Sequence, residues 1–443
     1  MQDFPNLPKS WQVKTLGECL DYEQPTKYIV KSTKYDDSYK IPVLTAGKSF
    51  ILGYTNEIDG IFTQTPVIIF DDFTTDTKFV DFDFKVKSSA MKILHPKENI
   101  DIKFMYYLMQ TIQYRSDTHK RYWISQYAKI KIPIPPLEIQ RRIVKRLDEA
   151  FSRIESGTKH LKSAKGNLTK YKQSLLKSAF NGTLTNDSPI SQGESTAESS
   201  LRGSGKATTK QSIKSKMDCH ESANADSRND DKDSLNGESA NLPQGWTIKT
   251  LGEVCDIYTG NSINKEKKEK EFTGLKEGLN YIGTKDIGFD RIINYENGVK
   301  IPLEKLKDFR VAKANVSLLC IEGGSAGRKI GFTNQEVCFV NKLCCFEPFE
   351  DESKFIYFYL QSSYFLQKFN LNMSGLIGGI SKEKIKQIKI PIPPLEIQRQ
   401  IVAILEKHFT SADKVSAYID SCLTKAKQLK SSLLKSAFAG ELV

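Results

Sequence analysis

The sequence predicts an α+β protein with two mixed, mainly β domains joined by two long antiparallel coiled-coil helices. Three observations lead to this fold class: the chain repeats internally, each repeat ends in a long heptad pattern, and short β-type runs fill the segments between. A chain of 443 residues can bury two or three separate cores. The predicted segments are a first domain at 1–136, a helix at 137–182, a disordered polar linker at 183–241, a second domain at 242–394 and a helix at 395–443.

Three motifs occur twice and frame two dissimilar middles. The first, Leu-Pro-x-x-Trp and its continuation, keeps eight of twelve residues, and the proline-rich second motif is unchanged over twelve. The third reads Ser-Leu-Leu-Lys-Ser-Ala-Phe-x-Gly-x-Leu in both copies. The motifs lie at 7–18 and 242–253, at 130–141 and 388–399, and at 174–184 and 432–442. The middles, 19–129 and 254–387, look unrelated, which predicts separable modules in one frame.

The middles read as β-rich segments that end in a helix. Runs of β-branched and aromatic residues are separated by turn residues, as strands require. The runs lie at 41–44, 66–70, 78–84 and 90–94 in the first middle, and at 281–283, 316–321, 329–333 and 337–346 in the second. A helical pattern follows at 104–113 and at 354–369, respectively.

The proline-rich motif introduces a long helix in each repeat. Proline is tolerated in a first helical turn, no further proline occurs from Leu137 to Phe180, and Gly182 follows as a C-terminal cap. Apolar residues recur every seven positions, and large and small residues alternate between the two copies, which predicts that the helices pair with each other. The alternative is that each helix packs on its own domain. The predicted pairing residues are Leu147, Ile154, Leu161, Leu168, Leu175, Leu405, Val415, Ile419, Leu429 and Leu433.

Charge and cysteine usage narrow the function classes. The net charge is +12, and the polar linker is acidic, so the folded parts carry the basic excess that attracts polyanions. Eight cysteines without a Cys-x-x-Cys pair, and only five histidines, favour free thiols in a reducing cytoplasm over a zinc site. No apolar run approaches the length of a membrane span.

Several short motifs leave alternatives open. Thr45–Ser49 resembles the end of a phosphate-binding loop but lacks its first glycine. Asp71 and Asp72 follow a strand, where they could cap a turn, accept from a cytosine amino group or hold a metal. The glycine-rich segment 323–328 could let the backbone approach a phosphate or a groove. No glycine fingerprint for a methyl donor and no Asn-Pro-Pro-Tyr tetrapeptide occurs, so we assign no catalytic residue and no metal ligand.

The three repeated motifs carry a resemblance to a known family: Leu-Pro-x-x-Trp, the proline-rich motif and Ser-Leu-Leu-Lys-Ser-Ala-Phe-x-Gly. In these motifs the chain resembles the specificity (S) subunits of type I restriction-modification systems, over about 1–184 and 242–443. The resemblance implies that each middle is a target-recognition domain reading one half of a bipartite DNA site, and that the helices dock methyltransferase subunits. It implies a non-catalytic subunit whose partners are double-stranded DNA, two methyltransferase (M) subunits and restriction/translocase (R) subunits. S-adenosylmethionine would bind to the methyltransferase, ATP and Mg to the restriction subunit, and no cofactor to this chain. A methylation-only or phase-variable system, and a coiled-coil scaffold without a DNA role, are the alternatives.

The candidate DNA contacts combine basic, polar and aromatic residues near turns and before the tails. They are Lys48, Asp71, Asp72, Thr74, Thr75, Lys78, Lys120, Arg121, Tyr122, Lys285, Arg291, Ser325, Arg328, Lys329, Asn341, Lys342 and Lys382.

Overall fold

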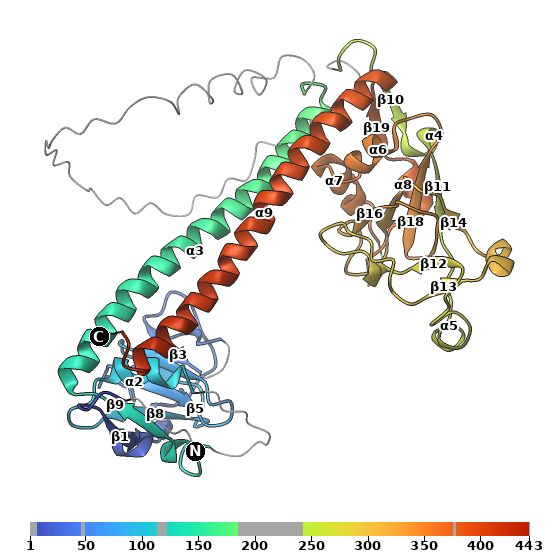
Figure 1. Cartoon of the computed structure of the whole chain (residues 1–443). Helices are drawn as coiled ribbons and strands as arrows, with labels where there is room; N and C mark the ends of the chain where they lie inside the picture. The colour runs from blue at the N-terminus through green and yellow to red at the C-terminus, as the bar shows by residue number, and fades with distance from the viewer. Residues whose placement is uncertain (1–6, 46–48, 113–121, 185–241, 375–377, 443) are drawn as a thin grey trace, which may run out of the picture. The chain divides into compact units, whose positions relative to one another are not determined.

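The computed structural model describes residues 7–45, 49–112, 122–184, 242–374 and 378–442. Contacts divide the chain into a first unit, Met1–Lys165 with Ala417–Val443, and a second unit, Gly166–Ser416. Each unit holds one β-rich domain and a part of both long helices, α3 (Leu137–Phe180) and α9 (Leu395–Phe438) (Figure 1). This α+β arrangement confirms the predicted fold class. Among the described residues, no helix combines the length and apolar character needed to cross a membrane.

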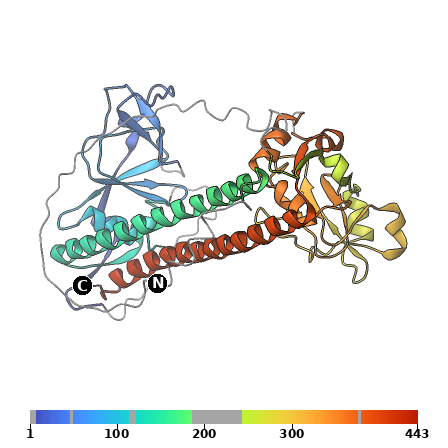
Figure 2. The same ribbon diagram turned by 90° about the horizontal axis from the view of Figure 1, so that it is seen from above.

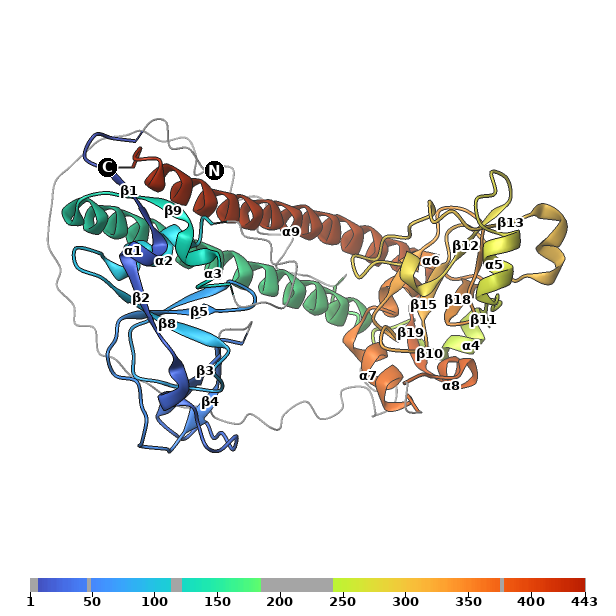
Figure 3. The same cartoon turned by 90° about the horizontal axis from the view of Figure 1, so that it is seen from below.

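The first domain is built from two sheets. An antiparallel sheet has the order β2 (Leu20–Glu23), β8 (Met91–Pro96), β5 (Val67–Asp71) and β6 (Thr77–Val80). The second has the order β4 (Ile51–Thr55), β3 (Ile41–Leu44) and β7 (Lys85–Val86), with β3 and β7 parallel. Figure 3 shows β3 and β4 of this sheet.

Strand β5 is covered on both faces. Ile68 and Phe70 join the core that contains α2 (Ile102–Met109), while Val67 and Ile69 join the core beneath the three-stranded sheet. A strand buried on both faces needs apolar residues at every position, which explains the unbroken run from 67 to 70.

The second domain repeats the strand order of the first. Its main sheet runs β11 (Cys255–Thr259), β18 (Leu343–Pro348), β15 (Ser317–Cys320) and β16 (Ile330–Phe332). Its second sheet runs β13 (Lys300–Ile301), β12 (Leu279–Ile282), β17 (Val337–Phe339) and β14 (Val311–Ala312), again with one parallel pair, β12 and β17. The helices are α5 (Lys265–Glu271), α6 (Ser353–Tyr359), α7 (Ser363–Leu371) and α8 (Lys382–Lys386). The main sheets of the two middles therefore share one strand order although their sequences look unrelated, and the second sheet of the second domain has one strand more, β14.

Three runs that the sequence predicts as single elements are not continuous in the structure. The run predicted at 78–84 is strand only as far as Val80, where β6 ends, and β7 begins after the run, at Lys85. The run 337–346 divides at a turn in which Leu343 N–H donates to Val340 O at 3.0 Å. The helix predicted at 354–369 ends as α6 and restarts as α7, because Ser362 Oγ accepts from Phe365 N–H at 3.2 Å and caps the new helix. The latter two breaks contain neither glycine nor proline, so turn signals do not reveal them.

The repeated motifs at the borders form one small frame in each unit. β1 (Gln12–Thr15) pairs with β9 (Lys131–Ile134), and β10 (Thr247–Thr250) pairs with β19 (Lys389–Ile392), in the same antiparallel register. The one-turn helices α1 (Leu16–Cys19) and α4 (Leu251–Val254) follow the first strands, each with a Thr–Glu capping box. The start of each repeat is thereby tied to the segment that launches its long helix.

A buried glutamine explains why the proline-rich motif continues as Leu-Glu-Ile-Gln. Gln140 Oε1 accepts from Asp101 N–H at 2.8 Å, and its Nε2 donates to Pro135 O at 2.9 Å. Gln398 makes the matching bonds to Glu352 N–H and Pro393 O, at 2.9 and 3.0 Å. Each glutamine thus satisfies backbone groups where a domain helix starts and where a long helix starts.

The tail of each repeat completes the core of the other repeat's domain. In the first unit, Phe438 of α9 packs edge-on against Phe104 of α2, with ring centroids 5.2 Å apart, and Gly440 lies against Pro8. In the second unit, Phe180 of α3 packs against Phe355 at 5.2 Å, and Gly182 lies against Pro243. Both glycines have positive φ, as the close approach and the helix end require.

The long helices pair antiparallel. In the first unit, Glu155 and Lys165 of α3 bind Lys430 and Asp420 of α9 at 2.7 and 2.6 Å, so rising numbers on one helix meet falling numbers on the other (Figure 2).

An equivalent Phe–Lys–carboxylate set lies between the two long helices in each unit. In the first, Lys430 lies 5.1 Å from the Phe151 ring centroid and binds Glu155. In the second, Lys172 lies 4.8 Å from the Phe409 ring centroid and binds Asp413.

Two of the predicted pairing residues, Val415 and Leu429, do not face the partner helix. Leu147, Leu175, Leu405 and Ile419 are buried, and Ile154, Leu161, Leu168 and Leu433 are half-buried. Val415 and Leu429, however, are 48% and 51% exposed. The residues one position after these two, Ser416 and Lys430, belong to the heptad row that faces the partner helix. This row also contains Phe151, Lys172 and Phe409. A lysine can occupy such an inward position because its methylene stem covers apolar surface while its ammonium reaches a carboxylate.

Candidate nucleic-acid interface

In the second unit, the glycine-rich loop joins two other segments that carry candidate residues. Gly323 N–H donates to Gly378 O at 2.8 Å, and Ile380 N–H donates to Ile321 O at 3.1 Å. Ile321 N–H in turn donates to Lys342 O at 3.0 Å. Backbone bonds therefore place the loop at 322–328 between the Asn341–Lys342 turn and the segment that leads into α8.

An exposed phenylalanine gathers cations beside this loop. Phe289 is 60% exposed, and both the Arg328 guanidinium and the Lys329 ammonium lie 5.1 Å from its ring centroid. Lys329 also donates to Thr284 O at 2.9 Å, next to the exposed Lys285. A guanidinium stacked on a ring keeps its N–H edge available for phosphate or guanine. Phe289 was not singled out from the sequence, although an aromatic residue between Gly288 and Asp290 in a turn was a usable signal.

The remaining candidates of the second unit are placed less centrally. Arg291 is half-buried, with its guanidinium 5.9 Å from the Phe409 ring of α9. Ser325 is half-buried at the tip of the loop, and Asn341 is exposed on the adjoining turn. Lys342 binds Glu322 at 3.2 Å, and Lys382 lies 4.0 Å from Glu383.

In the first unit, Asp71 caps the β5–β6 turn. Its Oδ1 accepts from Phe73 N–H at 2.8 Å and from Thr74 N–H at 3.1 Å. These bonds agree with the interpretation of Asp71 as a residue that caps a turn. On this turn Thr74 is exposed and Thr75 has a φ of 62°, while Lys78 is half-buried on β6.

Asp72 holds the segment that re-enters the domain before the long helix. It is 2% exposed, its Oδ1 accepts from Trp123 N–H at 2.9 Å, and its Oδ2 lies 3.4 Å from the buried Lys92 ammonium. Tyr122 is buried at 4% exposure, with its N–H on Asp72 O. A base contact by Asp71, Asp72 or Tyr122 would require the turn to open, so we withdraw these three candidates. Lys48, Lys120 and Arg121 lie outside the described residues.

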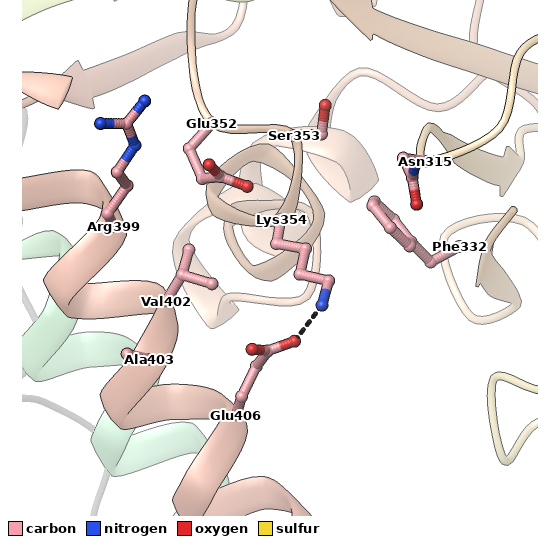
Figure 4. Close-up of a pocket in the computed structure, with 9 residues that line it drawn as sticks. All are labelled: Asn315, Phe332, Glu352, Ser353, Lys354, Arg399, Val402, Ala403 and Glu406. Atoms are coloured by element: carbon pink, nitrogen blue, oxygen red, sulfur yellow. Dashed lines mark hydrogen bonds and ion pairs between the residues drawn. The ribbon is translucent and has the colours of Figure 1, made fainter. Parts of the chain in front are cut away.

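Each unit has a cleft where the domain helix meets the long helices. In the second unit, Lys354 of α6 reaches Glu406 of α9 across a cleft of about 400 Å³, which Glu352 and Arg399 also line (Figure 4). In the first unit, Lys103 of α2 binds Asp148 of α3 at 2.8 Å in a cleft of about 710 Å³. The cation and the carboxylate occupy equivalent positions in the two repeats, and they fix each domain to its long helix.

The described cysteines do not gather into a metal site. No group of three or more His, Cys, Asp or Glu side chains suited to a metal occurs within the described ranges. Burial raises the pKa of Cys19 to about 11, and it raises the pKa of Cys344 and Cys255 still further. These thiols are protonated near neutral pH, whereas metal binding requires thiolates.

The comparisons with known proteins agree on one family. A family model described as the type I restriction modification DNA specificity domain matches residues 8–164 and 243–417. The EcoR124I/EcoR124II specificity subunit of Escherichia coli is 31% identical over 90% of this chain and 87% of its own length. The EcoDI specificity subunit of Escherichia coli is 20% identical over 98% and 89%. One solved structure comes from work on complex assembly and conformational transition of the type I R-M system. It superposes with a TM-score of 0.66 at 19% identity, over 98% of this chain and 99% of that chain. This likeness supports the fold alone.

Proposed function

Because the chain belongs to the family of type I restriction-modification specificity subunits, we propose a DNA-binding face in each of its units. The chain is the non-catalytic subunit that gives the complex its DNA sequence specificity, and each β-rich domain reads one half of a bipartite target. The observation that carries the assignment is the double match of the family model, once over each repeat.

In the second unit, the proposed face is the glycine-rich loop with the cations around Phe289. Arg328 and Asn341 are the best candidates for base contacts, because both are exposed and both flank the loop. Lys285, Arg291, Ser325, Lys329, Lys342 and Lys382 would contact phosphates or support the loop. In the first unit, Thr74, Thr75 and Lys78 form the corresponding face on the β5–β6 turn.

Separate alanine variants of Arg328 and Asn341 test the second face. Methylome sequencing of cells that express the complex first gives the target of the unchanged chain. Each variant should then lose about 1–3 kcal/mol of discrimination, roughly 5- to 150-fold, at one base pair of one half-site. Thr74→Ala is the matched variant and should affect the other half. Equal losses in both halves would contradict the assignment of one face to each half.

The partner face is proposed from residues that are both repeated and exposed. Glu138 with Arg141, and Glu396 with Arg399, form equivalent pairs at 3.1 and 3.8 Å, and their side chains are 59% to 80% exposed. Exposed pairs of this kind stabilise a fold little, so stability does not explain why they recur. A partner present in two copies would meet the same surface in each unit, and we assign this surface to the two methyltransferase subunits.

Charge reversal at these arginines gives a stoichiometry test. Arg141→Glu alone and Arg399→Glu alone should each lower the number of methyltransferase subunits per chain from two to one, as read by native mass spectrometry. The double variant should bind none. Arg142→Gln is the control, because the second repeat already has glutamine at that position, Gln400. Two bound subunits in the double variant would rule out this face.

The other components follow from the family. By the family resemblance we assign S-adenosylmethionine to the methyltransferase subunits and ATP and Mg to restriction subunits where these are present, and we propose that the complex acts in the cytoplasm.

A further inference from the structure

A groove of about 590 Å³ on the second unit is lined by cations and by no acidic residue. Its lining residues come from α7, α8 and the two-stranded ribbon of β10 and β19. Figure 3 shows where these elements lie in the second unit. Lys368 comes from α7, Lys384 from α8 and Lys389 from β19, and Tyr364 and Gln387 add polar groups. Ile248 and Pro391 add apolar surface beneath them.

The charge of this groove differs from that of the two clefts at the long helices. In the second unit's cleft, Lys354 and Arg399 are matched by Glu352 and Glu406. In the first unit's cleft, Lys103 and Lys430 are matched by Asp148 and Glu155. Balanced clefts have little net attraction for an ion. In this groove the exposed Lys384 and Lys389 meet no carboxylate among the lining residues, while Lys368 lies 5.8 Å from the Tyr364 ring centroid, so the lining carries a net positive charge that attracts an anion.

The groove is continuous with the glycine-rich loop through a short stretch of chain. The segment bonded to Gly323 and Ile321 leads directly into Ser381, whose Oγ caps α8 by accepting from Lys384 N–H at 3.4 Å. The Lys384 ammonium then donates to Asn372 O at 3.3 Å, which holds the side chain at the groove. The loop and the groove are therefore connected through the short segment that enters α8.

We propose that this groove binds the phosphate backbone of the DNA next to the half-site read by the second unit. The inference rests on the proposed function and adds residues to it. Lys384 and Lys389 contact successive phosphates, Lys368 adds a third cation, and Gln387 donates a hydrogen bond of the kind that fixes register. These contacts carry no sequence information, so they contribute to affinity and to its salt dependence but leave the recognised sequence unchanged.

The salt dependence of binding tests the groove. The full chain is titrated into a fluorescent random-sequence duplex at several salt concentrations between about 50 and 200 mM. Each lost phosphate contact should lower the slope of log K against log salt by about 0.9, which is about eightfold in affinity near 0.1 M salt. Lys384→Gln/Lys389→Gln should therefore lower the slope by about two, while Lys384→Arg/Lys389→Arg should keep it. Lys389→Gln alone, which changes one exposed side chain, should lower the slope by about one if the double variant does not fold.

A matched control comes from another lysine-rich element of the same unit. Lys265 and Lys270 of α5 are 89% and 73% exposed, but each pairs with a glutamate of its own helix, so Lys265→Gln/Lys270→Gln should keep the slope. Unchanged slopes in folded groove variants would overturn the proposal. So would an unchanged slope with loss of methyltransferase binding, which would assign the groove to a protein partner. If the unaltered chain bound DNA without salt dependence, the proposed function itself would fail.

Discussion

Phe438→Ala is the sharpest test of how the repeats interlock. Phe438 is 8% exposed and belongs to the core of the first unit, where it packs against Phe104. Removing a buried phenylalanine side chain costs about 3–5 kcal/mol, and the remaining exposure and the position near a helix end favour the lower value. We therefore expect about 3 kcal/mol of lost stability in a domain that begins more than 300 residues earlier in the sequence.

Hydrogen exchange with mass spectrometry can locate the loss. Amides in β5, β8 and α2 that exchange through opening of the first unit should exchange about 150-fold faster, because 3 kcal/mol is roughly two factors of ten. Amides of α6, β15 and β18 in the second unit should be unchanged. Phe180→Ala is the reciprocal variant: its side chain packs on Phe355 and Tyr359, so the faster exchange should appear in the second unit instead. Faster exchange in α6 and β18 for Phe438→Ala would mean that each tail packs on the domain of its own repeat.

Three further outcomes follow from the structure. Asp72→Asn leaves the buried Lys92 ammonium without its carboxylate and should lower the free energy of unfolding of the first unit by about 3 kcal/mol, as measured by urea unfolding. Asp76→Asn, at an exposed position of the same turn, is the control and should change this free energy little. Gln398→Leu removes the buried bonds to Glu352 N–H and Pro393 O and should cost about 1–3 kcal/mol, with faster exchange at the start of α6; an unchanged melting curve would contradict the role given to this side chain. Hydrogen bonds from the Thr15 backbone and hydroxyl lower the pKa of Glu18, so this capping box stabilises the fold above the ordinary glutamate range and the stabilisation is lost as pH falls through the lowered value. Protection of Thr15 N–H against exchange should therefore fall in acid, and Glu18→Gln should remove this pH dependence.

The two long helices and the segments that border the middles were predictable, because their motifs occur twice in the sequence and contain strong local signals. The prolines before Leu137 and Leu395, the heptad repeats and the glycines after Phe180 and Phe438 each have a local physical cause, and the sequence shows every one of them. The runs predicted in the middles fall on β3, β5, β6, β8, β12, β15, β16, β17 and β18, whereas β2, β4, β7, β11, β13 and β14 lie outside every predicted run.

The candidate site was predicted less well because its residues are defined by tertiary contacts. Asp72 looks like an available carboxylate in the sequence, and only the fold shows that Trp123 and Lys92 occupy it. Lys172 and Lys430 look like surface lysines, and only the partner helix shows that they belong to the interface. Phe289 looks like an ordinary core residue, yet it is exposed beneath two cations.

The exchange of tails also sets an order for biosynthesis. The first domain leaves the ribosome early, but the part of its core supplied by Phe438 is made only after residues 166–437. At about 5–20 residues per second, this interval lasts roughly 15–55 s. The second domain meets no such delay, because Phe180 is already present when its strands emerge. The domain synthesised first is thus completed last, and its unfilled apolar surface around Phe104 is the place where a chaperone would act on the nascent chain.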